Sequence, residues 1–198
     1  MKPGTIAVFP LHSVLLPGGV LPLRIFEPRY LDMVSQCLRE GSGFVLSLIR
    51  EGQETGGGAV VWPVGAQVRI IDWDSLDDGL LGITVEAVSR VRLSNFREDR
   101  DHLLWAHAEP LPDDPDRVLP PEFATFARLL EKILEQIGPP FDRLEAHLDD
   151  AGWVAGRLTE LLPIDPEVKQ KLLEAGDPLS RLHLLRDAML ALQVLPEG

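Results

Sequence analysis

The sequence predicts an α+β protein in which a strand-rich part precedes a helical part. Up to about residue 111, apolar residues form short runs or alternate with polar ones, and Gly- and Asp-rich turn sequences separate these runs. Beyond about residue 119 they recur every three or four positions, which is typical of helices. A Pro- and Asp-rich stretch, PLPDDPDRVLPPE, lies between the two patterns. We therefore expect a strand-rich subdomain at 1–111, a linker at 112–118 and a helical subdomain at 119–198.

The first part contains several runs that are typical of strands, and they suggest a small closed or nearly closed sheet. Pro22 lies inside the second run and places it at a sheet edge or a bulge, because proline donates no ladder hydrogen bond. Pro63 and Gly65 suggest a bend inside the fourth run. The runs are TIAVF (5–9), VLPLRIF (20–26), FVLSLI (44–49), AVVWPVGAQVRIIDW (59–73), LLGITVEAVSRVRLSNF (80–96) and LLWAHAEPL (103–111).

One helix is expected within this strand-rich part, in the stretch EPRYLDMVSQCLREG. Pro28 suits the first turn of a helix, where its missing N–H costs nothing. Gly41 lies where a helix C-cap would be. The apolar residues that recur at helical spacing are Tyr30, Leu31, Val34 and Leu38.

Four helices with short links are expected in the second part, which is the pattern of a small bundle. The first helix ends before Gly138-Pro139-Pro140, and the second spans about Ala151 to Leu162. The last two begin at Asp165-Pro166 and Asp177-Pro178, because Asp caps the free N–H groups and Pro suits the first helical position. The apolar face of the first helix comprises Phe123, Phe126, Ala127, Leu130, Ile133, Leu134 and Ile137.

Charge and hydropathy narrow the classes of partner. The formal net charge is -12, and both parts are net acidic, which opposes nonspecific binding to nucleic acid or to anionic membranes. Prolines interrupt the apolar stretch 9–34, and no uninterrupted apolar run reaches the length of about 18 residues that a membrane span needs. The single cysteine, Cys37, fits a reducing compartment. We therefore expect a cytoplasmic protein that binds neither membrane nor nucleic acid.

The histidines and glycines give no sign of a metal or phosphate site. The five histidines lack the spacing of metal ligands, and His102 and His107 would face opposite sides of a strand. The triplet Gly56-Gly57-Gly58 lacks the GxxxxGK[ST] pattern and a following helix, so a hairpin loop is the better interpretation. We expect no metal and no cofactor.

Two clusters of charged residues and the search for a nucleophile give no catalytic candidate. The aspartates between 72 and 78 are interpreted as a solvated hairpin tip, since Asp-Asp-Gly is ordinary turn chemistry. The arginines between 90 and 100 are interpreted as exposed strand residues paired with carboxylates rather than as an RNA contact. No GxSxG motif occurs, and Cys37 lies in a helix without a catalytic context. We expect no catalytic residue.

Four segments of the chain carry motifs that occur together, in this order, in one known family. The first opens with Phe9-Pro10-Leu11 and ends with Pro28-Arg29-Tyr30. WPVGAQVRI (62–70) and GITVEAVSRVRL (82–93) follow, and in the latter Arg90 matches while Ala87 replaces the usual Gly. The fourth is LTELLPIDPEVKQKLLEAGDPLSRLHLL (158–185). Together they resemble the N-terminal domain of Lon protease, also called the Lon substrate-binding domain, over nearly the whole chain.

This resemblance implies a PUA-like β-barrel or curled sheet with one helix, followed by a C-terminal four-helix bundle. It also implies binding of unfolded or degron-bearing polypeptides, and support of oligomer assembly. The sequence ends at Gly198 without a Walker A motif or a Ser-Lys protease domain. The resemblance therefore implies a stand-alone, non-catalytic module that binds polypeptides or a specific protein partner, as an adaptor or regulator in protein quality control.

The loop LLPGGV, residues 15–20, is the candidate contact with polypeptide. We hypothesise that Leu15, Leu16, Pro17 and Val20 rim a groove for an extended apolar segment, because apolar side chains at loops often mark interaction sites. An equally good interpretation is that Leu15 and Leu16 fill one end of the barrel. Loss of folding on replacement of Leu16 and Val20 by Asp would favour that second interpretation.

Three other functions remain open at this point. PUA-like folds include RNA-binding domains, although the net charge of -12 opposes this. A hydrolase of unrecognised type is possible, since catalytic groups assemble in space rather than in sequence. A weak homo-oligomer is a structural alternative, through Phe123, Phe126 and Leu130 if the bundle does not cover them.

Overall fold

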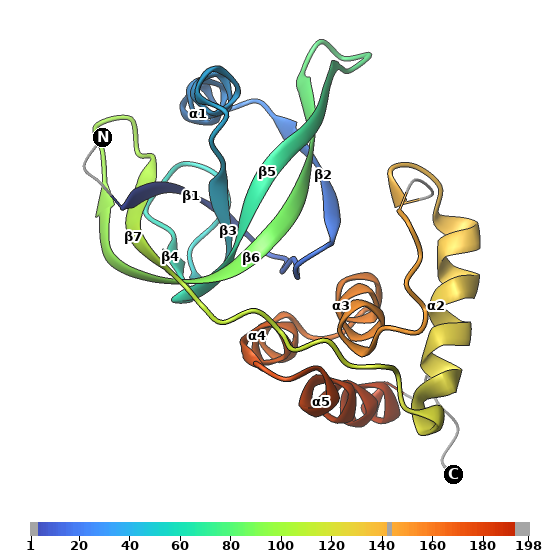
Figure 1. Ribbon diagram of the computed structural model, residues 1–198. Coiled ribbons are helices and arrows are strands. Elements are labelled where there is room, and N and C mark those ends of the chain that lie inside the picture. Colours follow the sequence, from blue (N-terminus) through green and yellow to red (C-terminus); the bar gives the residue numbers. More distant parts are fainter. Residues whose placement is uncertain (1–3, 142–143, 193–198) are drawn as a thin grey trace. The chain divides into compact units, whose positions relative to one another are not determined.

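The computed structural model describes residues 4–141 and 144–192 (Figure 1). The chain divides into two compact units, Met1–Leu111 and Pro112–Gly198. Each unit has its own apolar core. Residues 112–118, which the sequence suggests as a linker, belong to the second unit.

The first unit is built on a seven-stranded sheet with the strand order β1-β7-β6-β5-β3-β4, and β2 pairs with β6 beside this path. β1 also pairs in parallel with β3, with Val8 opposite Val45, so the sheet curls strongly on itself (Figure 1). The strands are β1 (Thr5–Leu11), β2 (Val20–Ile25), β3 (Phe44–Glu51), β4 (Val60–Val61), β5 (Val64–Ser75), β6 (Leu81–Glu98) and β7 (Leu104–Pro110).

The curled sheet is not a closed barrel. Within the described residues β2 pairs only with β6, and β4 pairs only with β3, so both keep an open edge. Pro22 lies in β2 opposite Thr84, which confirms the edge position expected for it. Proline on one edge strand and the shortness of the other are devices that discourage pairing with further chains.

The helix α1 (Pro28–Glu40) interrupts the strand series, as expected. Gly41 ends it in the left-handed conformation, with φ 61°. Its buried apolar residues are Tyr30, Met33, Val34 and Cys37. The expected face was partly wrong, because Leu31 and Leu38 are 38% and 45% exposed. These two leucines lie seven residues apart, on a line beside the buried stripe of the helix.

The second unit is helical. Asp150, Asp165 and Asp177 each accept a hydrogen bond from a backbone N–H of the helix that follows, so both Asp-Pro starts are confirmed. The elements are the 3-10 turn η1 (Pro121–Phe123) and the helices α2 (Ala124–Ile137), α3 (Ala151–Leu161), α4 (Pro166–Glu174) and α5 (Pro178–Ala191). A helical second part is confirmed; its assignment as a regular four-helix bundle stays a prediction.

The apolar core of this second unit includes the residues considered for oligomerisation. Phe123, Phe126 and Leu130 are 1%, 2% and 0% exposed, and the two phenylalanine rings pack edge to face with centroids 5.2 Å apart. These side chains are therefore covered within the unit and offer no surface to a second copy. None of the helices in the described residues is both long and apolar enough to span a membrane.

Candidate functional site

The segment proposed to rim a groove is mostly buried. Leu15, Leu16 and Val20 are only 2%, 1% and 5% exposed, and Leu15 belongs to the main core of the first unit. Pro17 is half-buried. The exposure expected for the three apolar side chains is therefore wrong, and their burial agrees with the interpretation that they fill the interior. Contact of this segment with a polypeptide stays a prediction.

A groove opens elsewhere in the first unit, beside the C-terminal half of α1. It is a groove of about 490 Å³, within the range of ordinary ligand sites. Met33 and Cys37 of α1 line it, together with Val68 of β5 and Trp105 of β7. Polar groups are fewer and include Gln36 and Gln67. This lining suits an apolar ligand that also presents hydrogen-bonding groups.

Two backbone features shape this groove. Gly43 permits the close approach of β3 to β5, because a Cβ at this position would lie 1.9 Å from the carbonyl oxygen of Val68. A register shift pairs Gln67 with Ser89 but Val68 with Ala87, and this leaves Val88 as the extra residue of a β-bulge. Val88 is 55% exposed and lines the groove. The bulge thus places an apolar side chain at the solvent side of the groove.

Cys37 lines the groove as a packed thiol. Its Sγ lies 3.6 Å from the carbonyl oxygen of Gly43, to which it donates. Burial raises the pKa of the Cys37 thiol, which reduces the fraction of reactive thiolate at neutral pH. The environment is therefore that of a structural cysteine and not of an activated nucleophile.

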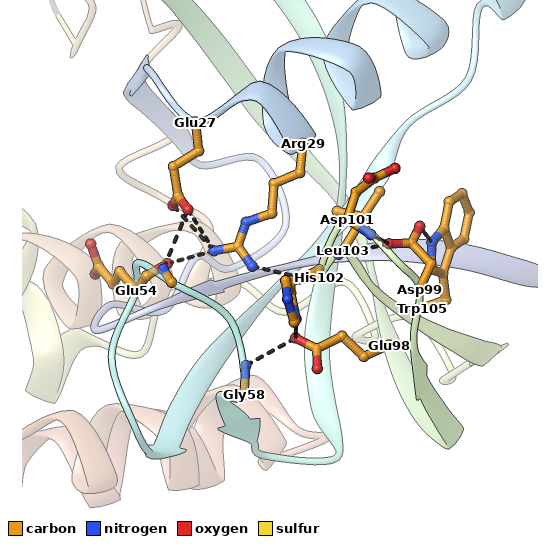
Figure 2. Close-up of polar contacts among 11 residues, drawn as sticks. Glu27, Arg29, Glu54, Gly58, Glu98, Asp99, Asp101, His102, Leu103 and Trp105 are labelled. Carbon is orange, nitrogen blue, oxygen red and sulfur yellow. Dashed lines mark hydrogen bonds and ion pairs between the residues drawn. The ribbon is translucent and has the colours of Figure 1, made fainter.

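A second, polar site surrounds Arg29 at the start of α1 (Figure 2). Its Nη1 donates to the carbonyl oxygen of His102 at 2.6 Å, and its Nη2 lies 3.0 Å from Oε2 of Glu27. Nη2 also donates to the carbonyl oxygen of Glu54 at 3.4 Å. The guanidinium carbon is 4.5 Å from the centroid of the Tyr30 ring. Arg29 thus joins α1, the β3–β4 loop and the β6–β7 turn, and the side chain is only 6% exposed.

Carboxylates hold the glycine-rich β3–β4 loop in place. Glu27 accepts a hydrogen bond from the N–H of Gly56 at 3.3 Å, and Glu98 accepts one from Gly58 at 2.9 Å (Figure 2). The loop passes so close that a Cβ at Gly57 would lie 2.7 Å from Oε1 of Glu98. The strands on either side pair antiparallel, as expected for a hairpin, but the three glycines also bring the loop against its neighbours.

Tyr30 lies beside Arg29, whose guanidinium stacks over its ring. Burial raises the pKa of Tyr30 to about 12, although the Arg29 charge acts to lower it. The negative charges of Glu27, Glu54 and Glu98 add to the rise. The phenol therefore stays protonated at all physiological pH values, and it lies in a region where negative charge predominates.

Asp99 organises the β6–β7 turn. Its Oδ1 accepts from the backbone N–H groups of Asp101 and Leu103, both at 3.0 Å, and its Oδ2 accepts from Nε1 of Trp105 at 2.8 Å (Figure 2). Burial acts to raise the pKa of Asp99, but these hydrogen bonds outweigh it and hold the pKa below its usual range. His102 adopts a left-handed conformation in this turn, with φ 63°, and its carbonyl oxygen accepts from Arg29.

The aspartates between 72 and 78 and the arginines between 90 and 100, noted in the sequence, belong to neither site. Asp78 at the β5–β6 hairpin tip pairs with Arg24, which fits the interpretation as turn chemistry. Arg90 is 4% exposed, so the expectation that it is an exposed strand residue was wrong. In the part of the chain that the structure describes, no three His, Cys, Asp or Glu side chains gather to hold a metal ion. Sequence reasoning missed the groove and the Arg29 site, although Pro28-Arg29-Tyr30 was among the motifs of the resemblance.

Known proteins match this chain over most of its length. A family model described as the ATP-dependent protease La (LON) substrate-binding domain matches residues 5–191. The Lon protease of Desulfovibrio desulfuricans and Lon protease 2 of Thermus thermophilus are both 27% identical to it, over 92% and 97% of this chain. The alignments cover only 22% and 25% of those two proteins, so the chain spans about a quarter of the length of the curated relatives it matches.

Solved structures agree with this match. The crystal structure of a Lon N-terminal domain protein from Xanthomonas campestris is 37% identical, covers 92% of this chain and 97% of its own, and gives a TM-score of 0.76. The N-terminal domain of a Mycobacterium avium complex Lon protease shares the fold, with a TM-score of 0.62 at 18% identity over 92% of this chain and 96% of its own. Because the family model spans nearly all of the described residues, the chain belongs to the Lon (protease La) substrate-binding domain family.

Proposed function

We propose that this chain is a non-catalytic polypeptide-binding module and that the groove beside α1 holds an extended apolar segment of a protein substrate. The family description names substrate binding, and the matched region is that domain. The observation that carries the proposal is the groove of about 490 Å³ with its mainly apolar lining. Its polar groups, such as Gln36 and Gln67, suit the main chain of a bound peptide.

A substitution at Val88 directly tests whether the groove binds the peptide. It lines the groove and is 55% exposed, so Val88→Asp adds a charge to the groove with little effect on packing. We expect this variant to weaken binding of a fluorescent apolar peptide by roughly tenfold or more, because a bound apolar segment would desolvate the carboxylate. Fluorescence anisotropy with the purified chain measures this affinity.

Val60 supplies the matched control. It is 41% exposed, lies in β4 of the same unit and does not line the groove. Val60→Asp should therefore leave peptide affinity unchanged. Equal effects of the two substitutions, or no saturable peptide binding by the unmodified chain, would refute the groove as the binding site.

The proposed biological role is that of an adaptor or regulator in protein quality control. An adaptor must change how fast a protease degrades the polypeptide it binds. We expect the chain to alter the degradation rate of an unfolded model protein by a purified Lon protease, and Val88→Asp to reduce that effect. An unchanged rate at saturating concentrations of the chain would argue against this role.

A further inference from the structure

One aromatic side chain forms part of the wall of the groove beside α1. Of the described residues that line the groove, Trp105 is the only aromatic one and has the largest side chain. It lies in β7 opposite Ala7 of β1, which lines the groove as well. The indole is half-buried and packs against the main core of the first unit. Trp105 therefore offers the groove a broad apolar surface of the kind that often anchors a bound partner.

A residue outside the groove holds the polar edge of this indole. Nε1 of Trp105 donates to Oδ2 of Asp99 at 2.8 Å, and Asp99 itself does not line the groove (Figure 2). The other carboxylate oxygen, Oδ1, accepts from the backbone N–H groups of Asp101 and Leu103. Both oxygens of Asp99 are thus engaged. The β6–β7 turn fixes the carboxylate, and the carboxylate fixes the indole.

A second contact restrains the same ring. Arg97 of β6 is the strand partner of Trp105, and its guanidinium carbon lies 5.7 Å from the centroid of the Trp105 ring. A cation at this distance is attracted to the electron-rich face of an indole. The contact acts on the ring face and leaves the N–H to Asp99. An indole N–H that loses its acceptor needs another partner, which at a half-buried site is water.

We propose that Asp99 is a positioning residue for peptide binding, and that it acts through Trp105 by holding the indole in the orientation that forms the groove wall. The inference rests on the proposed function, because it assigns a control of affinity to the same groove. A side chain that is ordered before binding loses no further freedom when the peptide arrives, whereas ordering it during binding costs affinity. The β6–β7 turn therefore sets the affinity of a groove that Asp99 does not touch.

A double-mutant cycle tests whether Asp99 acts through the indole. Asp99→Asn should weaken binding of an uncharged apolar peptide roughly two- to fivefold, the lower part of the range for one ordered side chain, because tryptophan has only two side-chain torsions. Trp105→Phe removes the N–H donor and keeps an aromatic ring. In the Trp105→Phe background Asp99→Asn should cause no further loss of affinity. Losses that simply add in the double variant would overturn the proposal.

The indole N–H of the unmodified chain gives a readout that needs no stable variant of Asp99. Its heteronuclear NOE, assigned by the loss of the signal in Trp105→Phe, should be as high in the free chain as in the peptide complex. In Asp99→Asn it should fall in the free chain and recover on binding. An indole that is mobile in the free unmodified chain and becomes rigid only with peptide would overturn the proposal, even if Asp99→Asn does not fold.

Asp101→Asn is the matched control for Asp99→Asn. It removes a neighbouring exposed carboxylate of the same turn and keeps the backbone N–H that Asp99 accepts. We expect it to change neither the peptide affinity nor the NOE of the indole, and an equal loss of affinity in both variants would show that charge alone is responsible.

Failure of this inference is distinguishable from failure of the proposed function. Saturable peptide binding with equal affinity in the unmodified chain and in Asp99→Asn would overturn the role of Asp99 and leave binding in the groove intact. A lack of saturable binding by the unmodified chain would refute the proposed function, and the positioning role would fall with it.

Discussion

Asp114 accepts a hydrogen bond from Nη1 of Arg181, with 2.5 Å between the two atoms. Arg181 lies in α5 and is 1% exposed, and its other nitrogens donate to the carbonyl oxygens of Leu172 and Ala175 at the end of α4. One buried guanidinium therefore caps α4 and ties down the segment that the sequence suggests as a linker. Proline and aspartate mark a change of structure there, and the segment is fixed within the second unit.

Replacement of Arg181 by methionine should destabilise the second unit strongly. Methionine fills similar space but leaves Asp114 and the carbonyl oxygens of Leu172 and Ala175 without this donor. We expect a loss of about 3–5 kcal/mol, which is typical when one partner of a buried ion pair is removed. Urea unfolding followed by circular dichroism measures this loss. Arg186→Met is the control: Arg186 is exposed, its nearest carboxylate is 4.0 Å away and its guanidinium carbon is 5.9 Å from the Phe123 ring centroid, so its loss should cost at most about 1 kcal/mol.

Arg29→Lys should release the glycine-rich loop although it keeps the charge. A lysine ammonium cannot reach Glu27, the carbonyl oxygen of His102 and that of Glu54 together, because the planar fork of arginine is lost. We expect a loss of about 1–3 kcal/mol from the hydrogen bonds left unmade, with faster hydrogen exchange in residues 52–59. Arg39→Lys, on the exposed side of the same helix, should change neither quantity. Unchanged exchange in the loop would show that Arg29 does not hold it.

Asp99→Asn should produce a stability loss that depends on pH. The folded-state pKa of Asp99 lies below its unfolded-state value of about 3.9. The stability that the ionised carboxylate contributes is therefore fully present above about pH 3.9 and is lost as the pH falls through the folded-state value. We expect Asn to cost about 1–3 kcal/mol near neutral pH, because its amide cannot accept all three hydrogen bonds.

The urea midpoints of the unmodified chain and of Asp99→Asn should approach each other as the pH is lowered from about 6 to about 3. Asp101→Asn removes a neighbouring exposed carboxylate that accepts none of these bonds, so its midpoint should follow that of the unmodified chain. A gap between the unmodified chain and Asp99→Asn that does not change with pH would mean that the charge of Asp99 contributes nothing.

Local signals explain which parts of the fold the sequence predicts. Gly41 and the caps at Asp165 and Asp177 depend on a few neighbouring residues, so they are visible in the sequence and are confirmed. The strands follow from alternation and turn chemistry in the same way. The open edges of the sheet are not visible, apart from the sign that Pro22 gives, because pairing partners are distant in sequence.

The candidate sites depend on distant contacts, and this is why sequence reasoning missed them. In the sequence Arg29 looks like any other helical residue, because the carbonyl oxygen to which it donates, that of His102, is 73 positions away. The bulge at Val88 depends on the register between β5 and β6, which no local pattern fixes. Conversely, Leu16 looks like an exposed loop leucine but is 1% exposed, because glycines and prolines mark a turn without telling where its side chains point.

Cys37 should report occupancy of the groove, so its alkylation gives a second test of the binding site. It is the only cysteine in the chain, it lines the groove and it is 5% exposed. Burial raises the pKa of its thiol, so alkylation by a maleimide should be slow near neutral pH and should speed up as the pH rises. A saturating apolar peptide should slow it further in proportion to occupancy, as followed by mass spectrometry. In Val88→Asp the same peptide concentration should protect much less, because binding is weaker. Protection that persists unchanged in Val88→Asp would mean that the peptide shields Cys37 from another surface, whereas peptide binding without any protection would place the bound segment outside the groove.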